Sequence, residues 1–165
     1  MSIAIAIIKR IFLHGVDNKE TIMKTLQQLL DQKNYKNVIS VLPQQSVFDA
    51  LVLMAEYKIG ALVVLQNEQL AGIFSERDYA REVVLKGKTS KTTPISEVMT
   101  SQVIVVKPSD TVDHALSLIT DKRIRHLPVI QNNRVVGMLS IGDLVKETID
   151  YQQRLIQQLE QYIRS

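Results

Sequence analysis

Residues 72–78 read GIFSERD and residues 137–143 read GMLSIGD, so the pattern Gly-x-x-Ser-x-x-Asp occurs twice, 65 positions apart. Sliding the chain against itself by 65 residues aligns residues 38–80 with residues 103–145 without a gap, and 16 of the 43 aligned positions are identical. Chance would supply only a few identities. Self-similarity at a fixed offset is typical of a repeated structural unit. The sequence therefore predicts two copies of one unit.

Each copy is predicted to run strand, helix, strand, strand, helix. Short β-branched runs at residues 38–42 and 103–106 lead into a proline, which predicts a strand and then a turn. Ser46 and Thr111 stand where a helix N-cap is needed, and apolar residues recur behind them at i, i+3, i+4 and i+7. These apolar residues are Val47, Ala50, Leu51 and Met54 in the first copy, and Val112, Ala115, Leu116 and Ile119 in the second.

Polar turns at residues 66–69 and 131–134 separate two apolar runs in each copy, which predicts a β-hairpin. A second helix is expected from Glu76 to about Lys86, and again from Ile141 onward. A unit of this size buries too little surface to be stable alone. We therefore expect an α/β (α+β) fold in which two βαββα repeats pack sheet to sheet about a pseudo-twofold axis, with extra terminal helices.

The repeat also sets the expected domain boundaries. They are an N-terminal extension with a short helix at residues 1–35, a first domain at 36–93, a second domain at 94–150, and a C-terminal helix extension at 151–165. The polar segment 87–93 reads as a flexible linker. Residues 1–22 leave two interpretations open, since they form either an extension upstream of a start at Met23 or a short amphipathic helix docked on the body.

Composition excludes several classes of protein. The 165 residues are 45% hydrophobic and 22% charged, which is typical of a folded domain. Zero cysteines and three scattered histidines argue against a disulfide scaffold, a thiolate nucleophile and a metal site. The net charge of +3 suits a phosphate-bearing small ligand better than nucleic acid. No apolar run approaches the roughly 18–20 residues that span a membrane.

The apolar run at the amino terminus ends at Lys9-Arg10, so it is too short for a secretion signal and its charges follow it. We therefore predict a cytoplasmic protein.

Two interpretations of the repeated Ser-x-x-Asp motif stand side by side. The spacing is that of a capping box, in which the hydroxyl and the carboxylate satisfy free amides at a helix start. The same geometry suits a nucleotide, because a helix N-terminus attracts phosphate and an aspartate one turn in can accept hydrogen bonds from ribose hydroxyls. Apolar residues nearby, Ile59, Ala61 and Ile73, are candidates to flank a purine ring.

The chain resembles a tandem pair of cystathionine-β-synthase-type (CBS) domains. The resemblance covers residues 38–148 and rests on V-I-S-V-x-P, I-G-A-L-V-V and G-I-F-S-E-R-D in the first copy. It continues with V-I-V-V-x-P, R-I-R-H-L-P-V and G-M-L-S-I-G-D-L-V in the second. Because these elements occur in the right order and are duplicated, the match is highly specific. The continuation E-R-D-Y-A-R-E and the long final helix resemble small stand-alone bacterial CBS-pair proteins.

The resemblance implies a regulatory module that binds an adenosine-containing ligand, such as AMP, ADP, ATP, NAD(H) or S-adenosylmethionine, in clefts between the domains. By resemblance, Asp78 and Asp143 match ribose-binding aspartates, and Ser75 and Ser140 match the hydroxyl near ribose and phosphate. Ser40 matches a position that meets adenine.

The resemblance also implies that Arg125 and His126 form a basic pair facing phosphate, whereas their counterparts Gly60 and Ala61 are small and suited to a base. Arg77 and Arg81 are either phosphate ligands or part of a solvated helix face, and His126 alone would be a hydrogen-bonded strand residue. We therefore predict one better site, in which Ser75 and Asp78 face Arg125 and His126, and one weaker or empty site.

The end of the chain carries an apolar stripe with alternating spacings of four and three, formed by Val145, Ile149, Gln152, Ile156, Leu159 and Ile163. The spacing indicates a short coiled-coil-like seam, which either packs back on the module or joins two chains in a homodimer.

No nucleophile elbow or phosphate-binding Walker loop is present in the sequence. We therefore predict a non-catalytic sensor that needs no cofactor, contacts no membrane and signals to an effector protein, with a ligand-free dimeric interaction scaffold as the alternative.

Overall fold

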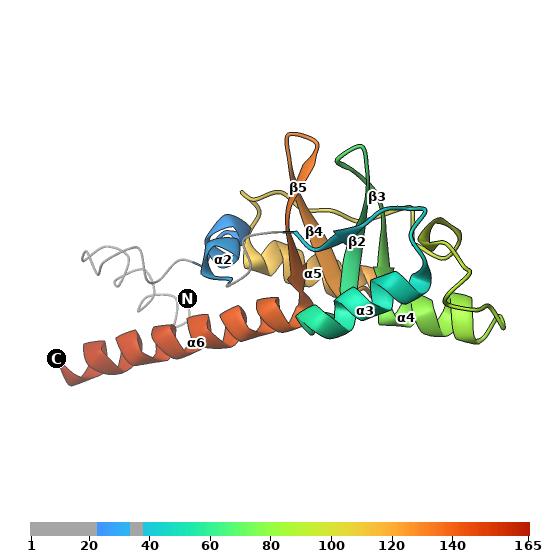
Figure 1. The fold of residues 1–165 in the computed structure, drawn as a ribbon. Helices are drawn as coiled ribbons and strands as arrows, with labels where there is room; N and C mark the ends of the chain where they lie inside the picture. Colours follow the sequence, from blue (N-terminus) through green and yellow to red (C-terminus); the bar gives the residue numbers. More distant parts are fainter. Residues whose placement is uncertain (1–22, 34–37) are drawn as a thin grey trace.

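The computed structural model describes residues 23–33 and 38–165 (Figure 1). The two interpretations of residues 1–22 concern a segment outside the described residues. The first repeat contains β1 (Ser40–Val41), α3 (Val47–Tyr57), β2 (Ala61–Gln66), β3 (Gln69–Ser75), α4 (Glu76–Asp78) and the π-helical η1 (Tyr79–Val84). The second repeat contains α5 (Val112–Lys122), β4 (His126–Gln131), β5 (Arg134–Ser140) and α6 (Ile141–Arg164). Two further short elements are α2 (Leu26–Gln32) and the 3₁₀ turn η2 (Ile95–Glu97).

The predicted mixed α/β fold with two repeats is confirmed. In the first repeat, β1 runs parallel to β2, and β2 pairs antiparallel with β3. In the second, β4 pairs antiparallel with β5. The strands β3 and β5 contact each other, so the two small sheets pack side by side with their hairpin loops at the same end (Figure 1).

The two repeats share their hydrogen bonding as well as their sequence. The backbone N–H of Glu76 donates to the carbonyl of Gly60, and the N–H of Ile141 donates to the carbonyl of Arg125, 65 positions on in both cases. Both hairpins shift register at equivalent points, after Val64 and after Val129. Both turn in left-handed conformations, at residues 67–68 and 132–133, as two-residue hairpin loops require.

The predicted first strands are shorter than expected. Residues 38–42 contribute only Ser40–Val41 to the sheet, and residues 103–106 contribute a single bridge between Val106 and Val129. The second copy lacks the equivalent of the Ser40–Val63 pair. Pro128 occupies the position of Val63 there and has no N–H to donate to a neighbouring strand.

The helix expected from Glu76 to Lys86 also differs. After three residues it widens into the π-helix η1, where the N–H of Leu85 donates to the carbonyl of Ala80. Its counterpart α6 is a continuous helix of 24 residues whose C-terminal part projects from the body (Figure 1). No described helix combines the length and apolarity needed to cross a membrane.

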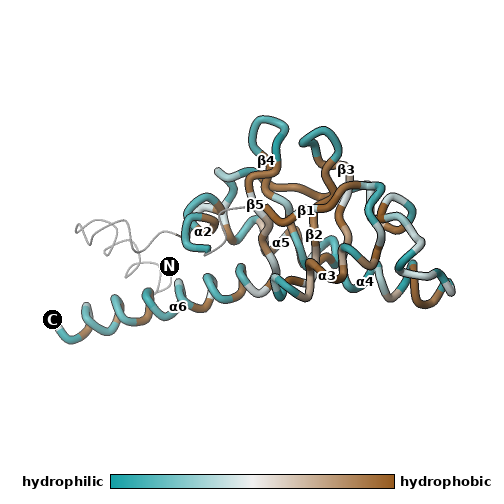
Figure 2. The backbone as a smooth tube through the Cα atoms, viewed as in Figure 1, coloured by the Kyte–Doolittle hydropathy of each residue, from teal (hydrophilic) through white to brown (hydrophobic). Residues whose placement is uncertain are grey.

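Each repeat has its own apolar core, and each core is completed by the segment that precedes the other repeat. Leu26 and Leu29 of α2 are buried in the core of the second repeat, which contains Leu127 and Leu139. Ile95 and Val98, at η2, are buried in the core of the first repeat with Phe74. Figure 2 shows apolar residues gathered along the strands, whereas α6 alternates between apolar and polar residues.

The segment 87–93, predicted to be a flexible linker, is held against the start of α3. The N–H of Val47 donates to the carbonyl of Thr93, and the N–H of Phe48 donates to the carbonyl of Ser90. Thr93 itself is buried. These contacts fix the path of the chain between the two repeats, so the polar composition of this segment misled the prediction.

Candidate functional site

Two pockets lie between the repeats, and each combines a Ser-x-x-Asp motif from one repeat with residues from the other. The Asp78 pocket has a volume of about 510 Å³, and the Asp143 pocket has a volume of about 780 Å³. The Asp78 pocket is lined by Ile73 and residues 75–78 of the first repeat, and by residues 102–104 and 123–126 of the second. The Asp143 pocket takes residues 57–61 from the first repeat, and 136–138, 140 and 143 from the second.

Ser75 and Asp78 form a capping box at the start of α4. The Ser75 hydroxyl accepts a hydrogen bond from the N–H of Asp78 at 3.2 Å. In return, Asp78 Oδ2 accepts from the N–H and the hydroxyl of Ser75, both at 2.9 Å, and Oδ1 accepts from the hydroxyl of Thr100 at 3.2 Å. The capping interpretation is therefore confirmed. All these donors are uncharged, and no described cation forms an ion pair with Asp78.

Four arginines line the same pocket: Arg77, Arg81, Arg123 and Arg125. Within the described residues none of them is in an ion pair. Arg77 is held in place, since its Nη1 donates at 3.1 Å to the carbonyl of Arg123, the left-handed residue that ends α5. Arg81 comes from the π-helix η1. Against these four cations the pocket holds two carboxylates, Glu76 and Asp78, so its net charge favours an anion.

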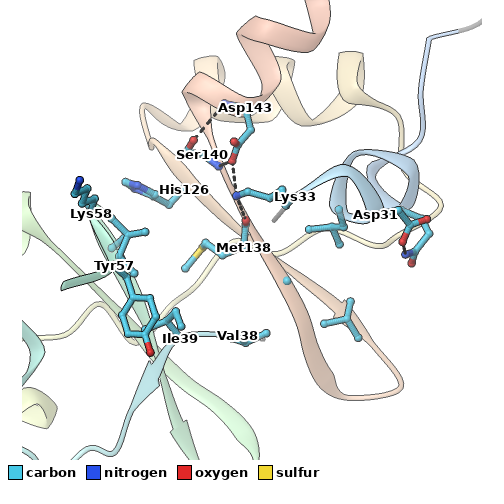
Figure 3. A pocket seen from close by; sticks show the side chains of 17 residues that line it. Asp31, Lys33, Val38, Ile39, Tyr57, Lys58, His126, Met138, Ser140 and Asp143 are labelled. Carbon is cyan, nitrogen blue, oxygen red and sulfur yellow. Dashed lines mark hydrogen bonds and ion pairs between the residues drawn. The ribbon is translucent and has the colours of Figure 1, made fainter. Parts of the chain in front are cut away.

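The Asp143 pocket differs in one contact. Ser140 and Asp143 form the same capping box, with Asp143 Oδ2 accepting from the N–H of Ser140 at 2.8 Å. The same oxygen also accepts from Lys33 Nζ at 2.7 Å, and Lys33 donates to the carbonyl of Met138 at 2.9 Å (Figure 3). Burial alone would raise the pKa of Asp143, but the hydrogen bonds from Lys33 and Ser140 and the charge of Lys33 hold it below its usual value.

His126 lines both pockets. Gly60 lies beside the ring, since a Cβ atom at that position would be 3.5 Å from the imidazole, an ordinary contact distance. Burial lowers the pKa of His126; Asp143 opposes this, while Lys33, Arg125 and Arg77 add to it. The ring is therefore neutral at neutral pH, and the positive charge of the predicted Arg125–His126 pair resides on Arg125.

The structure brings together most of the predicted site residues. The Asp78 pocket contains Ser75, Arg77, Asp78, Arg81, Arg125 and His126, and the Asp143 pocket contains Ile59, Gly60, Ala61, His126, Ser140 and Asp143. Ile73 lines the Asp78 pocket, but Ile59 and Ala61 do not. Ser40, on β1, lines neither pocket. The preceding residues Val38 and Ile39 line the Asp143 pocket.

Three pocket residues that sequence reasoning missed are Lys33, Thr100 and Arg123. Thr100 and Lys33 each contact the motif aspartate of the repeat that they do not precede. They lie just before the aligned segments 38–80 and 103–145, so the internal repeat gave no signal for them. Of the three, Arg123 could most easily have been predicted, because it is two positions from Arg125 in the stretch R-I-R-H.

What the site can do is bind and neutralise a small anion that also carries hydroxyl groups. Within the described residues, no group of three or more His, Asp or Glu side chains is placed to hold a metal ion.

Comparison with known proteins assigns both repeats to one kind of domain. The model of the CBS domain family matches residues 33–85 and 95–150. Among curated proteins, the chain is similar to the mitochondrial CBS domain-containing protein CBSX3 of Arabidopsis thaliana, with 40% identity over 124 residues. The match covers 72% of this chain and 60% of CBSX3, so the chain spans well under the full length of that relative.

Solved structures show the same architecture. A protein with CBS domains from Burkholderia ambifaria is 44% identical, with a TM-score of 0.74, and the match covers 77% of this chain and 95% of that one. The CBS domain pair of protein MJ0100, described in complex with 5′-methylthioadenosine and S-adenosyl-L-methionine, is 24% identical. Its TM-score is 0.67, and the match covers 76% of this chain and 95% of that one. At this identity the likeness to MJ0100 concerns the fold.

Proposed function

Because this chain belongs to the CBS-domain family, we propose that it is a non-catalytic regulatory protein that binds an adenine nucleotide in the Asp78 pocket. The observation that carries the proposal is the placement of charge in that pocket. A carboxylate whose described donors are all uncharged lies in one cavity with four arginines. A carboxylate accepts from the hydroxyls of ribose, and guanidinium groups bind phosphate.

The positive charge of the pocket favours binding of some candidate ligands over others. AMP, ADP, ATP and NAD(H) all carry phosphate, which the arginines of the Asp78 pocket would neutralise. The sulfonium cation of S-adenosylmethionine would be repelled by the same groups. The complex of the MJ0100 domain pair supports an adenosine compound in this fold without identifying which one binds here.

The contact between Lys33 and Asp143 supports the expected inequality of the two sites. In the Asp143 pocket the carboxylate is already neutralised by a cation at 2.7 Å, whereas Asp78 accepts hydrogen bonds from uncharged groups only. Ribose hydroxyls would compete with an ammonium group for Asp143, but only with uncharged donors for Asp78. The Asp78 pocket is therefore the better site in this proposal.

We further propose that the chain acts as a homodimer in the cytoplasm and signals to an effector protein of unknown identity. The exposed apolar side chains along α6 support self-association. A ligand that bridges the two repeats would shift the dimer between arrangements, by no more than its difference in affinity for them.

The test is thermal unfolding of the full chain with millimolar AMP, ADP, ATP, NAD, NADH or S-adenosylmethionine. A ligand at 100 times its dissociation constant stabilises the folded state by about 2.7 kcal/mol. For a chain of this size that is a rise of about 5–10 °C in the unfolding temperature. Asp78→Ala should abolish the rise, and Asp143→Ala should leave most of it.

Asp49→Ala is the matched control, because Asp49 forms a capping box with Ser46 and lines neither pocket. All three variants keep the N-cap serine and lose the carboxylate half of its capping box, which costs about 1 kcal/mol without ligand. Only Asp78→Ala should also lose the response to ligand. Equal losses in Asp78→Ala and Asp143→Ala would contradict the single better site. No response to any of the six ligands would favour the ligand-free dimeric scaffold.

A further inference from the structure

Lys33 is the one described cation in an ion pair with either motif aspartate, and it comes from outside both repeats. Its side chain leaves the C-terminal end of α2 and enters the Asp143 pocket, where Nζ contacts Asp143 Oδ2 and the carbonyl of Met138 (Figure 3). The two side chains are 31% and 26% exposed, so the pair is partly shielded from solvent.

Thr100 has the corresponding role at the other site. It precedes the second repeat and donates its hydroxyl to Asp78, whereas Lys33 precedes the first repeat and donates to Asp143, although the 65-residue offset aligns Thr100 with Tyr35 and not with Lys33. The two donors differ in charge, because the Thr100 hydroxyl is neutral and the Lys33 ammonium adds the attraction of a full positive charge to its hydrogen bond. The segment before each repeat therefore gives Asp78 an uncharged partner and Asp143 a cation.

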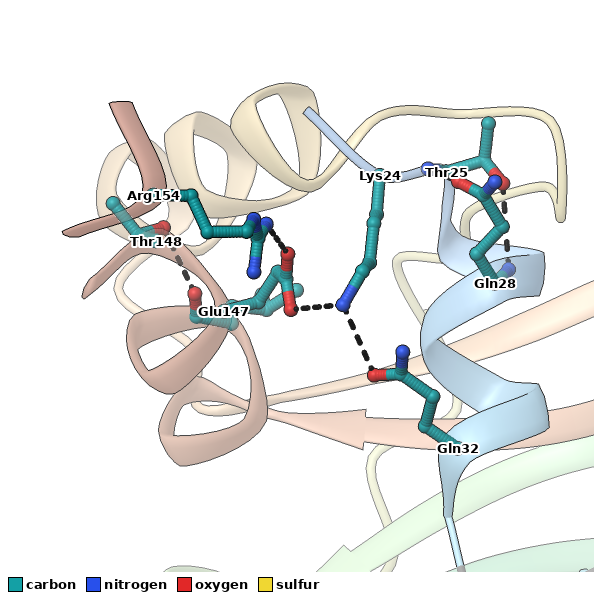
Figure 4. Close-up of polar contacts among 8 residues, drawn as sticks. Lys24, Thr25, Gln28, Gln32, Glu147, Thr148 and Arg154 are labelled. Carbon is teal, nitrogen blue, oxygen red and sulfur yellow. Dashed lines mark hydrogen bonds and ion pairs between the residues drawn. The ribbon is translucent and has the colours of Figure 1, made fainter. Parts of the chain in front are cut away.

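The anchoring of α2 makes this contact part of the fold. Leu30 packs so closely on Gly137 that an added Cβ atom would lie 2.4 Å from its Cδ2 atom. At the other end of the segment, Lys24 Nζ lies 3.0 Å from Glu147 Oε2, and Glu147 also accepts from Arg154 at 2.8 Å (Figure 4). Glu147 is only 2% exposed, so this carboxylate depends on its two cations.

Asp143 and Glu147 lie one turn apart at the start of α6. A lysine at each end of the segment 24–33 therefore contacts the beginning of α6.

We propose that Lys33 is a specificity-determining latch that makes the Asp143 pocket selective against nucleosides. The proposal rests on the proposed function, since it assumes that a free motif aspartate accepts ribose hydroxyls. The ribose of a ligand in this pocket competes with the Lys33 ammonium for Asp143. With Lys33 removed, Asp143 keeps its capping hydrogen bonds, and the Asp143 pocket becomes a site for adenosine, since no described arginine lines it to bind phosphate.

Calorimetric titration of the full chain tests the latch, with AMP added first to fill the Asp78 pocket and adenosine as the titrant. The wild type should then bind no adenosine in the Asp143 pocket, and Lys33→Met should bind one adenosine per chain as a second site. This site should be at least about tenfold tighter than any second site of the wild type, because the ribose no longer competes with an ammonium group. Combining Lys33→Met with Asp143→Asn should remove it.

Lys58→Met is the matched control, because Lys58 lines the same pocket and the substitution removes the same charge. It should not create a second site. The latch is overturned if Lys33→Met binds adenosine with the stoichiometry and affinity of the wild type, or if Lys58→Met gains the same second site. Failure of the proposed function looks different, since the wild type would then bind no AMP in the Asp78 pocket whatever Lys33→Met does.

Discussion

At the scale of single residues, the surroundings of a Ser-x-x-Asp motif matter more than the motif. The structure contains three such capping boxes, at Ser46, Ser75 and Ser140, and their hydrogen bonds are alike. Asp49 lines neither pocket, Asp143 is paired with Lys33, and Asp78 lines one cavity with four arginines. Capping and ligand binding are therefore compatible roles, since a carboxylate has more lone pairs than a cap uses.

His126 gives a prediction about pH. Its pKa in the folded protein is lowered by burial, with Lys33, Arg125 and Arg77 adding to the effect and Asp143 opposing it. At pH values below the ordinary histidine pKa of about 6.5, the unfolded chain therefore binds a proton at this residue more readily than the folded chain does. The free energy of unfolding should fall as the pH drops from 7.5 to 5.5, and His126→Gln should show a smaller fall.

Denaturant unfolding at the two pH values measures this difference. The interval lies above the ordinary values of the carboxylates, which are close to 4, so His126 is compared under conditions where Asp143 stays ionised. His114→Gln is the control, because His114 is exposed and lines neither pocket. A His126→Gln protein as sensitive to acid as the wild type would contradict a buried neutral imidazole.

The sequence predicted most of the site residues that lie within the aligned repeats and missed two that precede them. Ser75, Asp78, Arg125 and His126 could be expected to meet because the two repeats face each other. Lys33 and Thr100 could not, since each arrives from a segment before a repeat and packs on the opposite one. Ser40, which matches a position that meets adenine, lines neither pocket, because the Asp78 pocket is completed by the second repeat and not by β1.

At the scale of elements, the periodicity of apolar residues predicted those helices and turns that depend on a single segment. It failed where a neighbouring strand decides whether a strand forms. The helices α3 and α5 occupy the spans that their apolar stripes indicated, and both hairpins turn where expected. The first strand of the second repeat is reduced to a bridge because Pro128, on the neighbouring strand, cannot donate. That loss could not be read from residues 103–106.

The two motif glycines give a prediction at this scale. A Cβ atom at Gly72 would lie 2.9 Å from the carbonyl oxygen of Thr100, and that backbone is fixed by paired hydrogen bonds with Ile73. A Cβ atom at Gly137 would meet only the side chain of Leu30, which can move. Gly72→Ala should therefore destabilise the fold by about 1–3 kcal/mol, and Gly137→Ala should cost less.

Urea unfolding of the two variants measures the difference, and each glycine serves as the control for the other because both lie at equivalent positions of a hairpin. Adding a methyl group to a strand has the same intrinsic effect at both sites, so only the neighbours differ. A Gly137→Ala protein less stable than Gly72→Ala would mean that α2 is held as rigidly as the segment around Thr100.

At the scale of the whole molecule, the two repeats are interlocked by the segments that precede them. Because α2 completes the core of the second repeat and η2 completes the core of the first, neither repeat buries its core with its own residues alone. Each repeat therefore depends for its core on a segment that precedes the other. Among the described residues, the C-terminal end of α6 projects beyond this interlocked body (Figure 1).

The projecting end of α6 carries the last prediction. Val145, Ile149, Ile156 and Ile163 are exposed in the isolated chain, with Ile156 55% exposed. A row of such side chains at spacings of four and seven is covered when two helices pack along a shared seam. We expect the chain to sediment as a dimer and Ile156→Lys to sediment as a monomer, because a charge in the middle of the seam would be buried without a partner.

Gln161→Lys is the control, because Gln161 is exposed on the side of α6 away from the stripe and the substitution adds the same charge. It should remain a dimer in sedimentation velocity. Comparing both variants with and without AMP also separates assembly from binding, since the Asp78 pocket lies within one chain and does not involve α6. A monomeric Ile156→Lys protein should therefore still respond to nucleotide. A wild type that is itself monomeric at micromolar concentration would mean that the stripe of α6 does not join two chains.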